Sequence, residues 1–164
     1  MKMGSILNFH CQTCHKGIQF RIGCGMLYPK IYAATVAKAK NGEFGDTLKS
    51  FFEIYPDGAI DCSSVVIVCR NCGNLEQALE LSMYCPKADI EKDTSSKIWS
   101  VAVPCNDIEY VAPAKLRYNY DLYAEYPHKC SKCQGDAYIF RSQEKVPCPV
   151  CKNLMKHRVI GSSD

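Results

Sequence analysis

Four Cys-x-x-Cys pairs constrain the fold of this chain more than any other feature. Each pair places two thiols on one tight turn, and two such turns that face each other supply the four sulfur ligands of a tetrahedral metal ion. Four pairs therefore predict two closed metal sites with a structural role. The eight predicted ligands are Cys11, Cys14, Cys69, Cys72, Cys130, Cys133, Cys148 and Cys151.

Zinc is the metal that this donor set favours, and we expect two Zn²⁺ per chain. Iron in a rubredoxin-like centre is the minor alternative, because four thiolates also suit iron. Disulfides are the other possibility, since the chain has 12 cysteines, an even number. Cys-x-x-Cys is a poor unit for a secreted disulfide scaffold, however, so metal binding is the preferred interpretation.

The four pairs can be joined into two sites in three ways. We expect sequential pairing, in which the first two pairs form one site and the last two form the other. The spacing of the last two pairs is the reason. Residues 134–147 leave room for two short strands and a turn, which would return Cys148 to the side of Cys133.

Residues 128–158 resemble a zinc ribbon in the spacing of their two Cys-x-x-Cys pairs. The step from Cys72 to Gly73 resembles rubredoxin-type knuckles, in which a glycine lets backbone amides approach the sulfur. Zinc ribbons are a very broad family, found in nucleic-acid machinery and in many interaction modules. The resemblance implies zinc binding but no particular function.

We call each Cys-x-x-Cys turn a knuckle and number the four in chain order. Two helices are predicted between the first and second knuckles. One runs from Pro29 to about residue 41, because proline is favoured at the first helical position. The second is capped by Asp46 and has an apolar face at helical spacing. That face consists of Leu48, Phe51, Phe52 and Tyr55.

Strands are predicted from apolar runs and from alternation. Residues 64–69 read as a buried strand, 98–103 as a second, and 116–126 as a third with a period of two over its whole length. The segment after Gly73 fits either a helix or a strand, and residues 87–97 read as a loop. The expected fold is α+β, with a zinc-knuckle body at residues 1–127, made of antiparallel strands and inserted helices, and a C-terminal zinc ribbon at 128–164.

The remaining cysteines and the histidines near the knuckles are expected neither to bind metal nor to react. Cys24, Cys62, Cys85 and Cys105 have no pair spacing, which favours small buried side chains over a third site or a reactive thiol. His10, His15 and His128 are expected to lie outside the ligand set. The glycine-bearing turn at 23–29 precedes a helix, whose N-terminus can receive a phosphate. A turn that lets the chain approach the metal core closely is the preferred interpretation.

Function is less constrained than fold. The formal charge is +3, but each zinc tetrathiolate carries −2, so the metal-loaded chain is near −1 and bulk charge gives little argument for nucleic acid. We find no catalytic constellation, which makes an enzyme less favoured. The longest apolar run, 65–69, is too short to span a membrane, and no signal peptide is recognised, so a cytoplasmic location is expected.

The preferred function is a non-catalytic zinc protein that presents a rigid surface to a protein partner. The first alternative is nucleic-acid binding through the basic C-terminal module, with tyrosines beside it. A thiol or metal redox protein, or an enzyme with an unrecognised cleft, is the second. The basic residues of the first alternative are Lys129, Lys132, Arg141, Lys145, Lys152, Lys156 and Arg158.

Overall fold

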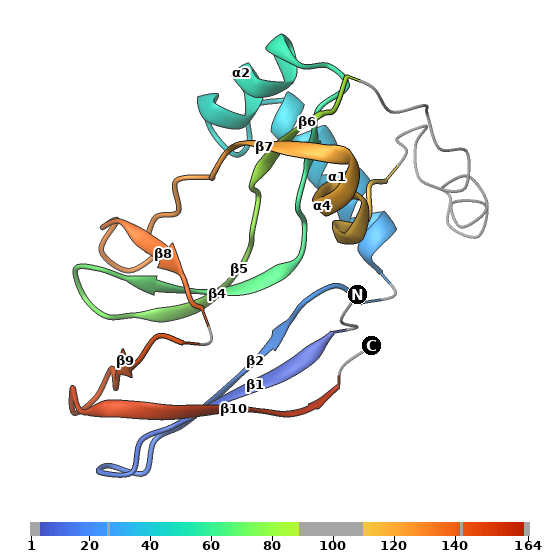
Figure 1. The fold of residues 1–164 in the computed structure, drawn as a ribbon. Helices are drawn as coiled ribbons and strands as arrows, with labels where there is room; N and C mark the ends of the chain where they lie inside the picture. Colours follow the sequence, from blue (N-terminus) through green and yellow to red (C-terminus); the bar gives the residue numbers. More distant parts are fainter. Residues whose placement is uncertain (1–3, 26, 89–109, 142, 163–164) are drawn as a thin grey trace. The chain divides into compact units, whose positions relative to one another are not determined.

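The structure is a computed structural model that describes residues 4–25, 27–88, 110–141 and 143–162. It confirms the predicted α+β class, with three helices in the described residues and antiparallel sheets (Figure 1). The chain divides into two compact units, each built from separate segments. Unit 1 comprises residues 26–63 and 81–126 together with Met1, and unit 2 comprises residues 2–25, 64–80 and 127–164. None of the helices in these ranges is both long and apolar enough to cross a membrane.

Unit 2 contains a four-stranded sheet in the order β2-β1-β10-β9. Along β1 and β2, more buried side chains alternate with more exposed ones, as expected for a sheet with one solvated face. The buried face carries Leu7, Phe9 and Met155. The strands are β1 (Ser5–His10), β2 (Gly17–Ile22), β9 (Val146–Pro147) and β10 (Leu154–Ser162).

A second sheet of unit 2 has the order β5-β4-β8. Its central strand is apolar on both faces, with Val66, Ile67 and Val68 all buried, and it delivers Cys69 to the knuckle. Side chains of both sheets form one apolar cluster, in which Phe9 and Phe140 meet edge to face. The strands are β4 (Ser64–Cys69), β5 (Leu75–Leu79) and β8 (Ala137–Ile139).

Unit 1 combines three helices with a three-stranded sheet in the order β3-β6-β7. Its core is aromatic and aliphatic: Phe51 and Phe52 of the second helix pack edge to face, and Tyr32, Leu48 and Met83 are buried. The elements are α1 (Tyr28–Lys40), α2 (Asp46–Ile54), β3 (Ala59–Ile60), β6 (Met83–Pro86), α4 (Pro113–Asn119) and β7 (Tyr120–Ala124).

The two predicted helices and the strand at 64–69 are confirmed. The predicted cap of the second helix is wrong. Asp46 is the first helical residue, and Gly45 is the N-cap at φ 87°, a conformation that favours glycine. The segment after Gly73, left open between helix and strand, is the strand β5, which pairs with β4 from Val68↔Leu75 to Ser64↔Leu79.

The predicted strand at 116–126 is wrong in its first half. Residues 113–119 form α4, because Pro113 lies in the first turn, where its fixed φ and missing N–H suit a helix. Leu116 alone in this helix is buried, so one apolar anchor holds it. The strand β7 begins only at Tyr120 and pairs with β6. The predicted strand at 98–103 and most of the loop at 87–97 lie outside the described residues.

The boundary expected at residue 127 coincides with one of several unit boundaries, but the segment after it is not a unit of its own. Residues 127–164 form one segment of unit 2, and the N-terminal segment 2–25 and the middle segment 64–80 belong to the same unit. Strand pairing is the cause, because β10 and β8 of the C-terminal segment pair with β1 and β4. The helices and the third sheet therefore belong to two long insertions into unit 2.

Candidate metal centres

The four Cys-x-x-Cys pairs adopt one and the same turn. In each, the N–H of the first cysteine donates to the carbonyl of the residue five positions later, at 2.9, 2.9, 2.9 and 2.7 Å for Cys11, Cys69, Cys130 and Cys148. The N–H four positions after the first cysteine donates back to the carbonyl of that cysteine. This double closure fixes both sulfurs on the inner side of a hairpin tip.

The residue after each second cysteine has a left-handed backbone. Its φ is 63° at His15, 73° at Gly73, 61° at Gln134 and 67° at Lys152. Gly73 adopts this conformation freely, whereas the other three side chains each cost about 1–2 kcal/mol. Gly73, on which the resemblance to rubredoxin-type knuckles rests, therefore marks a left-handed position that all four turns share.

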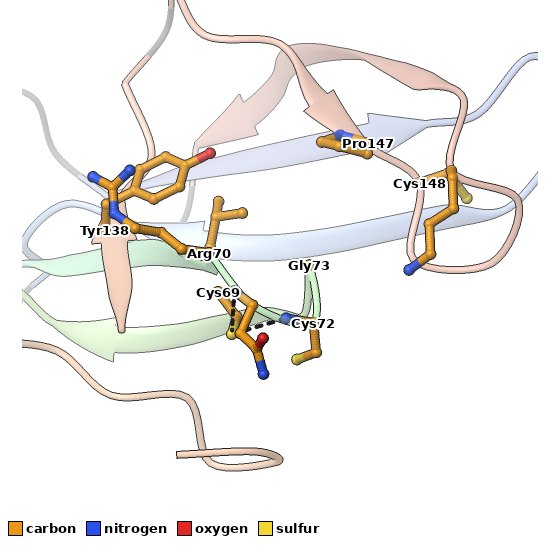
Figure 2. A pocket seen from close by; sticks show the side chains of 10 residues that line it. Cys69, Arg70, Cys72, Gly73, Tyr138, Pro147 and Cys148 are labelled. Atoms are coloured by element: carbon orange, nitrogen blue, oxygen red, sulfur yellow. Dashed lines mark hydrogen bonds between the residues drawn. The ribbon is translucent and has the colours of Figure 1, made fainter. Parts of the chain in front are cut away.

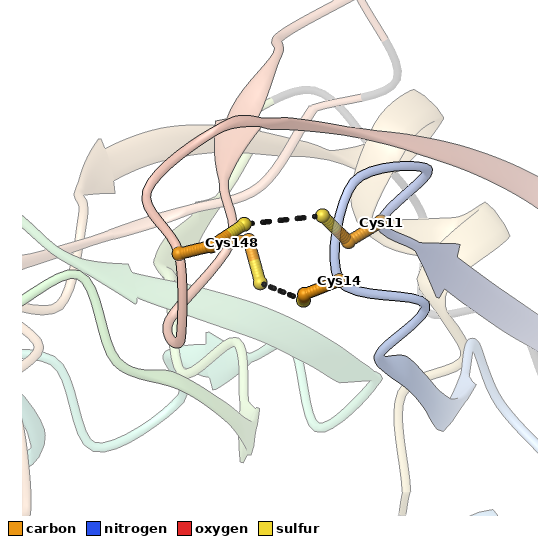
Figure 3. Close-up of side chains that lie close together, drawn as sticks. Cys11, Cys14 and Cys148 are labelled. Atoms are coloured by element: carbon orange, nitrogen blue, oxygen red, sulfur yellow. Dashed lines mark hydrogen bonds between the residues drawn. The ribbon is translucent and has the colours of Figure 1, made fainter.

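The sulfurs gather into two groups of four, and all ligand atoms in a group lie within 4.8 Å of one another. The first group joins the outermost pairs, with Sγ–Sγ distances of 3.4 Å between Cys11 and Cys151 and 3.5 Å between Cys14 and Cys148 (Figure 3). The second group joins the inner pairs, and it consists of Cys69, Cys72, Cys130 and Cys133.

The expected sequential pairing is therefore wrong: the pairing is nested. The physical reason is strand register. β10, which follows the fourth knuckle, pairs with β1, which precedes the first, and His10 lies opposite Lys156. β8, which follows the third knuckle, pairs with β4, which precedes the second, and Cys69 lies opposite Ala137. Strands β8 and β9 between the last two knuckles thus join different sheets instead of pairing with each other.

The two groups are built in the same way. Cys69 lies opposite Ala137, which is four positions after Cys133. The pairing His10↔Lys156, extended by one residue, likewise places Cys11 opposite Met155, four positions after Cys151. In both, the strand after the first knuckle, the strand before it and the strand after the second knuckle lie in that order. Unit 2 is thus a structural repeat whose halves are nested in the chain.

Both groups fit a tetrahedral ion. A Zn–S bond of about 2.3 Å places ligand sulfurs about 3.8 Å apart, close to the 3.4–3.6 Å found between nearest sulfurs here. None of the eight cysteines in the two groups forms a disulfide. Cys11, Cys130 and Cys148 are at most 1 % exposed, which shields the inner side of each site from water. Each group can therefore hold one metal ion with four sulfurs and no open position.

Amide groups point at several of the sulfurs. In the second group the N–H groups of Asn71 and Cys72 both lie 3.3 Å from Cys69 Sγ, and the Asn71 side-chain amide lies 3.5 Å from Cys133 Sγ. In the first group Asn153 Nδ2 lies 3.5 Å from Cys151 Sγ. Such donors stabilise thiolates. The signal in the sequence for these donors is an asparagine within or next to a knuckle, and the sequence analysis did not single out Asn71 or Asn153.

The same contacts divide the thiols by acidity. The Asn71 amide lowers the pKa of Cys133 to about 6, and the backbone amide of Asn153 lowers that of Cys151 to about 6. The backbone amide of Asn74 acts in the same direction on Cys72, but burial and the neighbouring thiols outweigh it and raise the pKa of Cys72 to about 12. Protons are therefore shared unevenly within each group, and a bound dication replaces them.

Gly135 is a packing requirement of the second group. A Cβ there would lie 2.8 Å from Asn71 Cβ, 3.2 Å from Cys133 Sγ and 3.4 Å from Cys69 Sγ. No real Cβ is found at the first of these distances, so any larger residue must displace the asparagine or the knuckle. This glycine was not singled out from the sequence, although it follows the third knuckle by only two positions.

The other predicted candidates lie outside both groups. His10 and His15 are exposed, with ring centroids 6.3 Å apart, and buried His128 lies with Nε2 2.9 Å from the Glu80 carbonyl oxygen. Cys62 is buried, and burial raises its pKa to about 12, which argues against a reactive thiol.

Two further cysteines and the glycine turn at 23–29 also lie outside both groups of ligands. Cys24 and Cys85 are only half-buried, and Cys105 lies outside the described residues. Within those residues there is no third group of ligands. Gly23 exchanges two backbone hydrogen bonds with Ser64, at 2.8 and 2.9 Å, in an isolated β-bridge at the end of β4 that lies away from Cys69.

One pocket of about 450 Å³ lies in unit 2 between the second and fourth knuckles (Figure 2). Arg70 and Tyr138 line one part of it, with the guanidinium 4.6 Å from the ring centroid. Lys152 lines another part, close to Gly73. Both cations belong to knuckles, so they would offset part of the negative charge of metal-bound thiolates.

The fold and the sites define an α+β protein with two four-cysteine metal groups in one unit. Comparison with known proteins adds nothing to this class, because no family model, curated protein or solved structure matches the chain.

Proposed function

We propose that the chain is a non-catalytic zinc protein, in which two Zn²⁺ ions are permanent parts of unit 2. The observation that carries this proposal is the closed donor set. Two hairpin tips supply all four ligands of each group, and a catalytic zinc needs an open position for water or substrate. Each ion then serves to hold together the two knuckles of one nested half, which lie far apart in the chain.

Zinc is preferred to iron because nothing in these groups calls for redox chemistry, and four thiolates in a closed tetrahedron are a common structural zinc site. Elemental analysis of the purified full chain tests this directly. We expect about two zinc per chain and a colourless solution. A red protein with stoichiometric iron would instead support the rubredoxin-like alternative.

The role proposed for this rigid unit is to support binding of another macromolecule, in a reducing, cytoplasmic setting. A protein partner is the first candidate. The edge strand β7 of unit 1 supports it, because its Leu122 and Tyr123 are 55 % and 48 % exposed, and Tyr118 of the preceding helix α4 is 70 % exposed. Exposed apolar side chains on a sheet edge suit the addition of a partner strand.

Nucleic acid is the second candidate, and the distribution of charge between the units favours it. The segments of unit 2 hold eleven lysines and arginines against five aspartates and glutamates, whereas those of unit 1 hold nine against twelve. Two zinc tetrathiolates leave unit 2 at about +2. The near-neutral total charge therefore conceals a basic unit and an acidic one.

Heparin chromatography of the zinc-loaded chain separates the two candidates. Binding that weakens steeply as salt rises favours nucleic acid, because counterion release makes phosphate binding salt-dependent. No retention at low salt favours the protein partner. Zinc content, measured on the same fractions, tests the structural role of the metal independently of the partner.

A further inference from the structure

We propose that the solvated face of the sheet β2-β1-β10-β9 binds the phosphate backbone of nucleic acid. This inference rests on the second candidate function and names the surface that performs it. The basic sheet face, as we call it, is formed by the outward side chains of the four strands. Apart from the irregular end of β10 beyond Arg158, they are Ile6, Asn8 and His10 of β1, Gly17, Gln19 and Arg21 of β2, Leu154, Lys156 and Arg158 of β10, and Pro147 of β9.

Strand register places three cations on this one face. Arg21 lies opposite Ile6, Lys156 lies opposite His10, and Arg158 lies opposite Asn8. All three cations are exposed. Residues directly opposite in an antiparallel pair share a face, so these side chains project in one direction from a common surface.

The basic sheet face has no carboxylate among its ten residues. Lys156 and Arg158 are two residues apart on one strand, about 6.8 Å. That spacing lets the two long side chains reach separate phosphates of one strand. Asn8 and Gln19, opposite each other at the centre of the face, add amide donors that suit phosphate oxygens.

The chemistry of the face also predicts how it binds. Base stacking needs aromatic platforms, and His10 supplies the sole aromatic ring among the ten residues. Contacts to phosphate carry no sequence information. The face should therefore bind with little sequence preference and with the salt dependence of about three phosphate contacts.

The other basic residues suggested by the sequence lie elsewhere. Lys129 forms an ion pair with Asp136, and Lys152 lines the pocket between the knuckles. Lys132, Arg141 and Lys145 are exposed but are not among the ten residues of the face. They offer a matched control, because removing them subtracts the same charge from the same unit.

Fluorescence anisotropy with a labelled 20-base-pair DNA duplex of mixed sequence tests the proposal, using the full zinc-loaded chain. We expect log K to fall with log salt concentration at a slope near −2.7, from about three phosphates at 0.9 each. The variant R21Q/K156Q/R158Q should lose at least tenfold in affinity at low salt and most of the slope. The control K132Q/R141Q/K145Q should stay within about twofold to threefold of the wild type.

Three results would overturn the proposal. Equal losses in the two triple variants would mean that only net charge matters, and a strong preference for one sequence would mean base readout. A wild-type chain that holds two zinc but binds neither duplex nor single strand would leave the structural role of zinc intact and point to a protein partner. Zinc content and circular dichroism of each variant show whether folding is unchanged.

Discussion

The two units of this chain solve the problem of stability in different ways. Unit 1 packs aromatic side chains between helices and a sheet, where buried Phe51 and Phe52 contact each other and Phe51 also contacts the less buried rings of Tyr55 and Tyr123. Unit 2 is built from short strands, and its apolar cluster includes two of the predicted metal ligands, Cys11 and Cys148. Metal binding and core formation are therefore the same event in unit 2 and unrelated in unit 1.

Removal of metal should have the largest effect, because it should unfold unit 2 and leave unit 1 folded. Each zinc contributes about 10–16 kcal/mol in comparable small sites, far more than the core of a small β unit supplies. We expect strong chelation to open the strands of unit 2, while α1 and α2 keep their amide protection in hydrogen exchange. If both units unfold together, or if unit 2 stays protected, the contrast between them is not real.

Acid should act on unit 2 in the same way. Cys14 and Cys72, with pKa raised to about 12, must lose protons to bind metal, so zinc affinity should rise with pH through the neutral range. Below about pH 6 the more acidic Cys133 and Cys151 are protonated as well. Affinity should then fall more steeply with falling pH.

Zinc competition with a chromophoric chelator across pH 5–8 measures this dependence. A uniform slope over the range would contradict the division of the thiols into more and less acidic members. The helical signal of unit 1 over the same pH range serves as the internal reference, since none of these thiols belongs to it.

A substitution at Gly135 should weaken the second metal group without touching unit 1. A Cβ at this position meets Asn71 Cβ and the Cys133 sulfur, and overpacking of this kind costs about 1–3 kcal/mol. Gly135→Ala should therefore lower the affinity of one of the two zinc ions by roughly tenfold to a hundredfold. Gly17→Ala is the matched control, because its added Cβ has no neighbour within 4 Å.

The left-handed positions of the knuckles should give the smallest effect. Gln134→Gly removes a side chain from a backbone at φ 61° and should stabilise unit 2 by about 1 kcal/mol. Gly73→Ala, at φ 73°, should destabilise it by a similar amount. Denaturant titration of the zinc-loaded chain, followed by a signal from unit 2, measures both. Effects of the opposite sign would show that these turns relax when metal binds.

The sequence predicted the elements of this fold better than it predicted their partners. Local signals sufficed for the helix that begins near Pro29 and for the strand at 64–69. The alternation at 116–126 misled, because residues 116–119 continue the pattern along the sequence but belong to the helix that Pro113 begins. Local patterns cannot weigh such an override by tertiary packing, since it depends on what Leu116 packs against.

The metal sites follow the same division between local and distant information. Spacing identified all eight cysteines that gather into the two groups. The pairing came out differently because it depends on which strands meet, and β1 and β10 are separated by most of the chain. The linker 134–147 is long enough for a hairpin, yet β8 and β9 take places in different sheets. Chain length permits both arrangements, and the burial of Phe9, Val66 and Met155 in a common core favours the nested one.

Metal stoichiometry of quadruple cysteine-to-serine variants tests the nested pairing most directly. Replacing Cys11, Cys14, Cys148 and Cys151 removes one whole group under nested pairing and half of both groups under sequential pairing. We predict that this variant retains about one zinc per chain, bound to four thiolates, as the absorption spectrum of its cobalt form would show. The variant that replaces the first two pairs should retain no tetrathiolate site. Loss of both metals from the former and retention of one by the latter would contradict the account.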